Sequence, residues 1–398
     1  MGLFRRKSAQ DRFAEEVIAH LRQAPAVREA VYDQSDFSIH VLYHGEEHGG
    51  RLYLENTFRE CSGRSRAERR ARIDGLIATI TATTVRNLTW AEVAGRLRPV
   101  VRSASFGQTG DPGAKPLLVR PALPYLGEFV VIDEPRSMAY VTAEHLREWG
   151  RTPEEVFAAA RANLSAIAAD AVEPVTPGKA MLHMADTGDS YFTSMLLLDG
   201  FLAGLAPRVG GRPVAFIPDR DSLIVIPDGP EPVARMLERA EQWYLDAPRG
   251  VSPMAYTCDE SGCVVPYRTV EPGRLADLVH RSEVMLAAAA YGGQTPALAA
   301  RYEREGIDVF VGNPLVAERP DGTLFSVAVW PIDCPTMLPH ADLVCFRSNT
   351  ESLMVPWPVV ARTTGLRPDD SLLPERYFVA AWPEPAVLDQ LRDEAVTP

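Results

Sequence analysis

Cysteine is scarce in this sequence, and the spacing of the cysteines matches no recognised motif. The 398 residues include five Cys. Cys258 and Cys263 have neither a Cys-x-x-Cys spacing nor a second pair that would complete a zinc site. An unpaired set of thiols is typical of a reducing compartment, so we expect a cytoplasmic protein. For Cys258 and Cys263 two interpretations stay open: half-buried free thiols, or a redox-sensitive pair across a hairpin that would make the chain a thiol sensor.

Long apolar runs are absent as well. The longest, Met195–Leu205 and Val284–Ala290, fall short of the roughly 20 residues that cross a bilayer, so we expect no transmembrane segment. The start, MGLFRRKSAQ, has no apolar stretch after its charges, and we expect no secretory signal there. Its basic cluster leaves open a weak contact with an anionic membrane, beside the simpler interpretation of a frayed terminus.

Positive charge is in deficit. The formal net charge is -12 and the pI is near 5.3, which argues against general nucleic-acid binding because that function needs a basic face. Hydrophobic residues make up 46% and charged residues 24% of the chain, a balance that indicates globular domains and excludes a disordered chain.

Catalytic signatures are missing too. The sequence has no Gly-x-Ser-x-Gly elbow, no His-Glu-x-x-His and no dinucleotide fingerprint after a strand. Gly210-Gly211 lacks the Lys-Ser/Thr that a phosphate loop requires. These absences predict no cofactor and favour a binding role over an enzyme.

What is present is organised around one apolar stretch, Thr187–Gly229. It predicts an apolar helix over 191–205, a Gly-Gly break, and two buried strands over 213–217 and 223–226. The charged turn Asp219-Arg220-Asp221 joins the two strands. We expect the helix and both strands to form the middle of one sheet-and-helix body.

The order of elements predicts an α+β fold with largely antiparallel sheets. Turn-rich segments suggest three parts: an N-terminal α+β subdomain (1–104), a core (105–248) and an appended α+β domain (249–398). In the last part we expect a helix over 274–290, a second helix over 296–305, and a hairpin across Arg319-Pro320-Asp321-Gly322.

Several stretches together resemble a known family. They are LRPVVRSASF, VVIDEPRSMAYVTAEHLREWGRTPEEVFAAARANL, YFTSMLLLDGFL and VAFIPDRDSLIVIPD. Over about residues 11–245 the chain resembles the YtpQ-like bacterial proteins, a family of unknown function. The resemblance implies a compact cytoplasmic α+β protein, carries no catalytic residues over, and leaves the segment after 250 uncovered.

Asp219, Arg220 and Asp221 are the most charged point of the most apolar region. Paired carboxylates around an Arg could bind a cation or act as acid and base, with His183 from a neighbouring strand, in a hydrolase or transferase. The alternative is a tight turn in which Asp side chains accept nearby backbone N–H groups. The turn is the favoured interpretation.

His40, His44 and His48 recur every four residues, with two Glu nearby, and are candidate metal ligands. On a strand and a turn this spacing separates the rings by more than a metal's reach. A solvated hairpin is the favoured alternative, and a metal sensor remains a third functional hypothesis.

Trp and Pro recur together in the last part of the chain, around Trp330, Trp357 and Trp382. Such side chains build rigid interaction surfaces, and equally they end strands and pack under loops. The leading functional hypothesis is a non-catalytic binding or scaffold protein that contacts a protein partner through residues 249–398.

Overall fold

The structure, a computed structural model, describes residues 8–34, 37–45, 50–82, 88–134, 137–171, 181–185, 191–348 and 351–397. Its contacts divide the chain into two compact units, which are described separately. The first comprises Met1–Pro99, Gly113–Leu118 and Val130–Asn163, and the second comprises Val100–Pro112, Val119–Phe129 and Leu164–Pro398.

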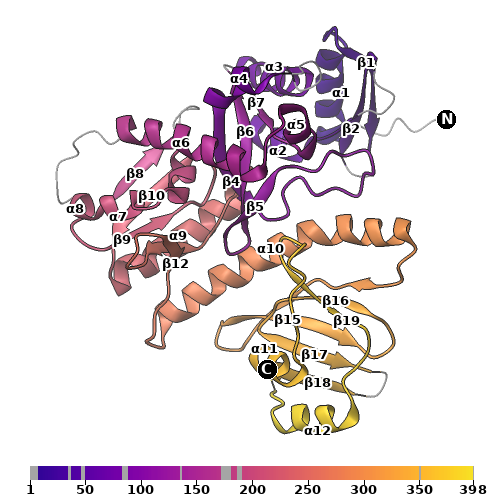
Figure 1. The fold of residues 1–398 in the computed structure, drawn as a ribbon, viewed down its shortest axis with the longest axis vertical. Helices are drawn as coiled ribbons and strands as arrows, with labels where there is room; N and C mark the ends of the chain where they lie inside the picture. Colours follow the sequence, from indigo (N-terminus) through magenta and orange to yellow (C-terminus); the bar gives the residue numbers. More distant parts are fainter. Residues whose placement is uncertain are drawn as a thin grey trace. The chain divides into compact units, whose positions relative to one another are not determined.

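The first unit begins with a helix against a small antiparallel sheet (Figure 1). Ser8 and Asp11 form a reciprocal capping box at the start of helix α1. The apolar stripe of α1 packs on the sheet and on α3, so Phe13, Ile39 and Ile73 share one core. The elements are α1 (Ala9–Leu21), β1 (Val27–Asp33), β2 (Ser38–Tyr43), β3 (Gly50–Tyr53), α2 (Glu55–Cys61) and α3 (Arg66–Ala82).

A second core of this unit forms around Trp149 and Val130. Thr89 and Thr142 are the N-caps of α4 and α5, and Thr152 with Glu155 forms a capping box at the start of α6. The elements are α4 (Trp90–Val93), η1 (Ala94–Arg96), β4 (Leu97–Ser103), β6 (Leu126–Glu134), β7 (Ser137–Tyr140), α5 (Ala143–Trp149) and α6 (Pro153–Ala171); β4, β6 and α6 continue into the second unit.

The second unit contains a five-stranded sheet in the order β12-β11-β9-β10-β8. The predicted strands β9 (Pro213–Phe216) and β10 (Ser222–Pro227) form its centre and pair antiparallel. They are flanked by β8 (Leu182–Ala185), β11 (Ala255–Cys258) and β12 (Val264–Pro266). Because β11 pairs directly with β9, this sheet runs across the division expected at residue 248.

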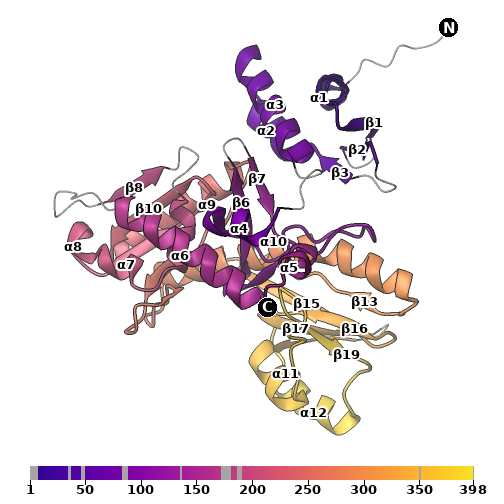
Figure 2. The ribbon, with the colours of Figure 1, turned by 45° about the horizontal axis from the view of Figure 1, so that its top comes forward.

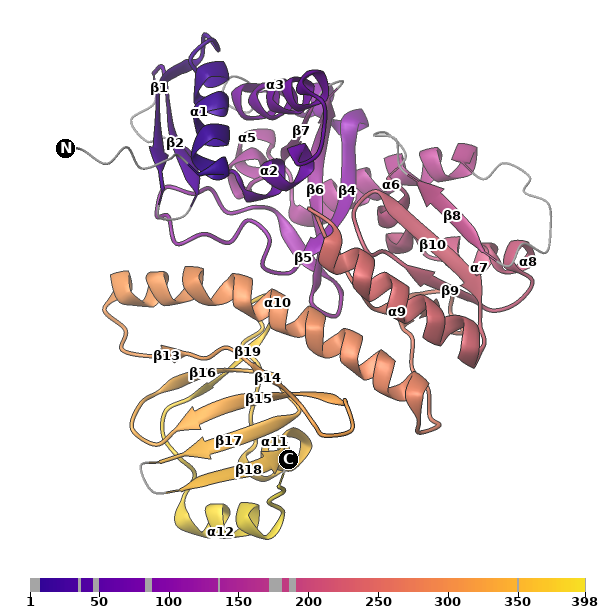
Figure 3. The same ribbon diagram turned by 180° about the vertical axis from the view of Figure 1, so that it is seen from behind.

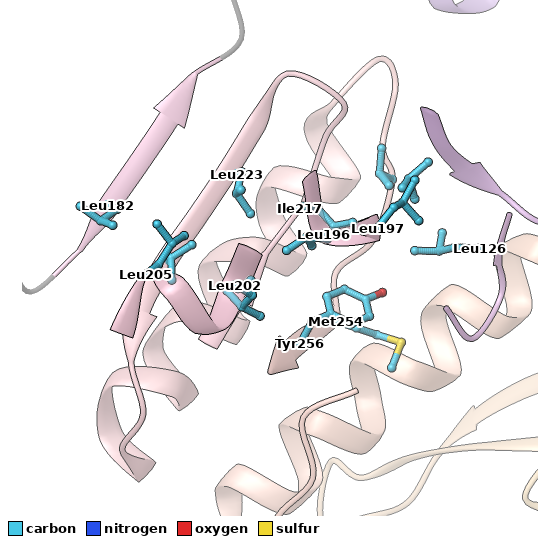
Figure 4. Close-up of a cluster of buried hydrophobic side chains, with 14 of the residues drawn as sticks. Leu126, Leu182, Leu196, Leu197, Leu202, Leu205, Ile217, Leu223, Met254 and Tyr256 are labelled. Carbon is cyan, nitrogen blue, oxygen red and sulfur yellow. The ribbon is translucent and has the colours of Figure 1, made fainter. Parts of the chain in front are cut away.

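The apolar segment before the sheet is not one helix, as the sequence predicts, but three short pieces. They are η2 (Phe192–Leu197), α7 (Phe201–Gly204) and α8 (Ala206–Val209). Gly200 adopts φ 77° and donates its N–H to the Gly262 carbonyl at 3.1 Å, which ends the first piece. Their leucines still fill the predicted core with Ile217 and Tyr256, as Figure 4 shows.

The other face of the five-stranded sheet is covered by α9 (Pro230–Asp246). After it comes α10 (Arg274–Glu305), one continuous helix where the sequence predicts two. Pro296 lies inside α10 and cannot donate to the preceding turn. The helix nevertheless continues past the proline. In the turn before it, Thr295 Oγ1 donates to the Tyr291 carbonyl at 2.9 Å, and Arg376 donates to the same carbonyl.

The C-terminal part of the second unit has two further sheets, ordered β13-β16-β19 and β14-β15-β17-β18. Helix α10 runs along them (Figure 3), and α11 and α12 cover the opposite side (Figure 2). The remaining elements are β5 (Val119–Leu123), β13 (Phe310–Val311), β14 (Leu315–Glu318), β15 (Leu324–Pro331), β16 (Thr336–Pro339), β17 (Leu343–Arg347), β18 (Ser352–Pro356), α11 (Trp357–Thr364), β19 (Arg376–Val379) and α12 (Pro385–Asp393).

Most strand pairs are antiparallel, with β13–β16 and β15–β17 as parallel exceptions. The predicted α+β class with largely antiparallel sheets is therefore confirmed, as is the hairpin that joins β14 to β15. Among the described residues, no helix combines the length and apolar character that a bilayer crossing requires.

Candidate functional site

The Asp219–Asp221 turn uses its polar groups within itself. Asp219 Oδ1 accepts the backbone N–H of Asp221 at 2.8 Å, and Asp221 Oδ1 lies 3.2 Å from Arg220 Nε. The carbonyl of Arg220 accepts a hydrogen bond from Thr193 Oγ1 at 3.3 Å. These contacts match the turn interpretation, and a catalytic role for the three residues stays a prediction without geometric support.

His183 does not join this turn. It lies on β8 opposite Ile224, near the middle of β10, whereas Asp219 precedes the first residue of that strand. The centroid of its ring lies 6.0 Å from that of Trp243 on α9. The structure therefore separates the imidazole from the carboxylates that it would have to assist.

The structure describes two of the three histidines that are candidate metal ligands. His40 lies on β2 opposite Val31, His44 is in the following turn, and His48 lies outside the described residues. No group of three His, Cys, Asp or Glu side chains in the described part of the chain is arranged to hold a metal ion. The metal hypothesis stays a prediction.

Cys258 and Cys263 are both free thiols at the β11–β12 hairpin. Cys258 faces Val264 across the hairpin, and Cys263 Sγ lies 3.8 Å from Asp199 Oδ1. The hairpin location is the expected one, while redox sensing stays untested.

The three tryptophans belong to the core of the C-terminal part. Trp330 and Trp357 are 3% and 6% exposed. Trp382 is half-buried, and its Nε1 donates to the Trp330 carbonyl at 3.0 Å. The packing interpretation thus applies to Trp330 and Trp357, because buried rings cannot also form an exposed interaction surface.

A cavity of about 500 Å³ opens beside this core. We call it the C-terminal cavity, and three segments far apart in the sequence build it: the end of β15, the end of α11 with the residues after it, and β19 with the start of α12. Its lining residues are Trp330, Thr363, Thr364, Gly365, Leu366, Arg367, Phe378, Val379, Ala381, Pro383, Glu384 and Val387.

The cavity has a buried apolar floor and an exposed rim. Trp330 and Val379 are 3% and 5% exposed and form the floor. Phe378 on the rim is 56% exposed, so its ring is accessible from solvent. The indole Nε1 of Trp330 is buried without an acceptor among the described residues.

Two charges of opposite sign also line the cavity. Arg367 follows α11, and Glu384 occupies the N-cap position of α12. Both are exposed, and the structure gives neither side chain a hydrogen bond or an ion pair with any described residue. An apolar floor with two available charges on its rim is an arrangement that can bind and orient a small ligand.

A second polar cluster lies where α10 crosses β15 and β17. His280 Nε2 lies 3.3 Å from Asp342 Oδ2, which also accepts the N–H and the hydroxyl of Ser326 at 2.7 and 2.9 Å. The hydrogen bond to Asp342 raises the pKa of His280. Burial opposes ionisation of Asp342, but the bonds from His280 and Ser326 outweigh it and lower its pKa.

This cluster does not have the order of a nucleophilic triad. The carboxylate stands between the hydroxyl and the imidazole, so the imidazole has no hydrogen bond to Ser326 through which to accept its proton. We therefore interpret the His280–Asp342 pair as a tie between α10 and the sheet. No local sequence motif announces it, because the two residues are distant in the chain.

The chain matches no protein family model, no curated protein and no solved structure. The resemblance to YtpQ-like proteins therefore stays a prediction.

Proposed function

We propose that this chain is a non-catalytic binding protein and that its ligand site is the C-terminal cavity. The observation that carries the proposal is the combination of volume and lining: about 500 Å³, a buried apolar floor, an exposed aromatic side chain and two available charges. Pockets that bind small molecules have volumes of roughly 300–1,000 Å³, and the volume of the C-terminal cavity lies in this range.

The distribution of polar groups elsewhere supports a binding role over catalysis. At the Asp219–Asp221 turn the carboxylates are engaged by neighbouring residues, and at Asp342 the carboxylate holds the fold together. The cavity, in contrast, offers polar groups that the fold does not use. A group left available at a concave surface can serve a ligand.

Thermal unfolding of the full chain against a panel of small apolar and aromatic compounds tests the proposal. A ligand present at a hundred times its Kd should raise the free energy of unfolding by about 2.7 kcal/mol. Ala381→Trp should abolish this stabilisation, because Ala381 lines the cavity and an indole there fills it.

Ala380→Trp is the matched control, since Ala380 is the adjacent exposed alanine and does not line the cavity. It should retain the response. A panel in which no compound stabilises the chain, or in which both variants respond alike, would contradict the proposal.

Docking of a protein partner is a second candidate, and the exposed ring of Phe378 favours it. Exposed aromatic side chains beside a pocket are frequent anchors of protein interfaces. Phe310 provides the control, because it is 48% exposed on β13 of the same sheet but does not line the cavity. A partner that uses this surface should lose affinity with Phe378→Asp and keep it with Phe310→Asp.

A further inference from the structure

The two charges on the rim of the C-terminal cavity have no partner among the described residues, whereas several other charges of this unit form ion pairs. Arg274 bonds to Glu238 at 2.6 Å, Arg281 to Glu241 at 2.8 Å and Arg392 to Glu351 at 3.2 Å. Arg367 and Glu384 line one cavity and have no such contact with a described residue. Any occupant of the cavity therefore lies within the field of one cation and one anion.

The sign of the charges restricts the occupant. A simple anion would be attracted by Arg367 and repelled by Glu384. A simple cation would be repelled by Arg367 and attracted by Glu384. A ligand that carries both charges avoids either repulsion. The guanidinium of Arg367 also has the planar donor geometry that binds a carboxylate through two parallel hydrogen bonds.

The floor restricts the occupant further. Trp330, Leu366, Val379 and Val387 provide apolar contacts beneath the charged rim. An apolar side chain that covers them removes its own surface and theirs from water, at roughly 25 cal/mol per Å². A purely polar zwitterion would leave this surface uncovered.

We propose that the C-terminal cavity binds a zwitterion with an apolar body, an aromatic amino acid or a short peptide with free termini. Its carboxylate pairs with Arg367, its ammonium group pairs with Glu384, and its side chain covers the floor. This inference rests on the proposed function and names the class of ligand for the same site.

Calorimetric titration of the full chain tests the inference with defined probes. L-phenylalanine and the dipeptide Leu-Phe carry both charges, and the comparison between them distinguishes an amino acid from a peptide as the source. Their N-acetyl and C-terminal amide derivatives each lack one charge. Each derivative should bind roughly tenfold more weakly than its parent, as expected for loss of one charge-assisted contact.

Variants of the rim assign each charge to its partner. Arg367→Gln should weaken the parent ligand roughly tenfold and should not weaken the amide further, since the contact is already absent. Glu384→Gln should behave in the same way toward the N-acetyl derivative. Arg362→Gln on α11 and Glu394→Gln after α12 change exposed charges that do not line the cavity, and both should bind as the unmodified chain does.

The outcomes separate this inference from the proposed function. If parent and blocked ligands bind equally well, or if the control variants lose as much affinity as the rim variants, the zwitterion inference is overturned while the cavity remains a binding site. If no probe binds and no compound in the thermal panel stabilises the chain, both proposals are overturned. Preference for the zwitterions that depends on Arg367 and Glu384 supports the inference.

Discussion

Arg367 and Arg376 belong to one stretch of the second unit and have opposite surroundings. Arg376 is completely buried, and its guanidinium donates to Gln294, Thr295 and the carbonyls of Tyr291, Gly312 and Met337. Arg367 is exposed beside the C-terminal cavity without a described partner. The comparison shows how to separate a charge that stabilises the fold from one that is available to a ligand.

The groups around Arg376 explain the physical difference between the two arginines. Its acceptors are neutral, so burial is not offset by a carboxylate and lowers its pKa to about 10. The ring of Tyr291 lies beneath it, with the guanidinium carbon 5.1 Å from the ring centroid. Helix α10 and strands β16 and β19 converge on this one side chain, and its polar capacity is fully used.

Replacing Arg376 should produce the largest effect. Arg376→Met leaves the amide oxygen of Gln294 and the carbonyl of Gly312 without their guanidinium donors, which should lower the free energy of unfolding by about 3 kcal/mol. Arg367→Met should change it by less than about 0.5 kcal/mol. Urea unfolding measures both, and similar midpoints for the two variants would remove the distinction.

The packing of α10 sharpens the comparison between the two arginines, because Arg376 donates hydrogen bonds to residues of this helix. A Cβ on Gly293 would lie 2.4 Å from Ser105 Oγ and 3.1 Å from Ser105 Cβ, whereas a Cβ on Gly292 would meet nothing within 4 Å. Gly292→Ala should therefore stabilise the chain by about 0.5–1 kcal/mol through helix propensity.

Gly293→Ala should be less stable than Gly292→Ala by at least about 1 kcal/mol, because Ser105 has to move. Thermal unfolding of the two variants gives this difference directly. Equal gains in stability for the two variants would mean that the loop around Ser105 is not closely packed on α10.

The Asp219–Asp221 turn extends the comparison to acidic residues. Asp219→Ala removes the acceptor of the Asp221 N–H and should cost about 1 kcal/mol, since a local side-chain cap of the backbone is lost. Asp221→Ala is the control and should cost less than about 0.5 kcal/mol, because the exposed carboxylate of Asp221 contacts its neighbour Arg220 in a surface ion pair. The reverse order in urea unfolding would contradict the turn interpretation.

The pH dependence of the His280–Asp342 tie should be the smallest effect. Because the pKa of His280 is raised above its unfolded value, the tie stabilises the fold below about pH 6.5 and weakens as pH rises through the raised pKa. The pair is partly exposed, so its contribution should be about 0.5 kcal/mol.

Glu283 and Arg319 also act on His280, the first raising and the second lowering its pKa. His280→Gln should therefore flatten the stability profile between about pH 6 and 8 without changing it elsewhere. An unchanged slope in that range would show that His280 does not titrate as part of the tie. At the acid end, the stabilisation that depends on ionised Asp342 should be lost as pH falls through its lowered pKa.

Local patterns predicted much of the fold. Apolar runs and turn residues located β9 and β10, and the turn residues Arg319-Pro320-Asp321-Gly322 located the hairpin between β14 and β15. The continuity of helices was harder to predict. Pro296 suggested a break that α10 does not have, and the apolar run suggested one helix, which Gly200 interrupts. At Gly200 a hydrogen bond to Gly262, distant in the sequence, accompanies the interruption.

The candidate site was harder to predict from the sequence than the fold. The Trp-Pro cluster pointed to the correct region, and Trp330 lines the cavity, but as a buried floor and not as an exposed surface. Arg367 and Glu384 lie in no motif. Their significance follows from their shared place on the lining of one cavity, which becomes visible once the segments around them are placed in space.

Thermal unfolding of the unmodified chain, Arg367→Gln and Arg376→Lys, each with and without saturating Leu-Phe, tests the central claim most directly. We expect Arg367→Gln to unfold at the original midpoint without ligand and to lose most of the ligand-induced rise. Arg376→Lys should unfold at a clearly lower midpoint, because lysine cannot replace the guanidinium donors. A lowered midpoint for Arg367→Gln without ligand, or an undiminished ligand response in that variant, would contradict the account.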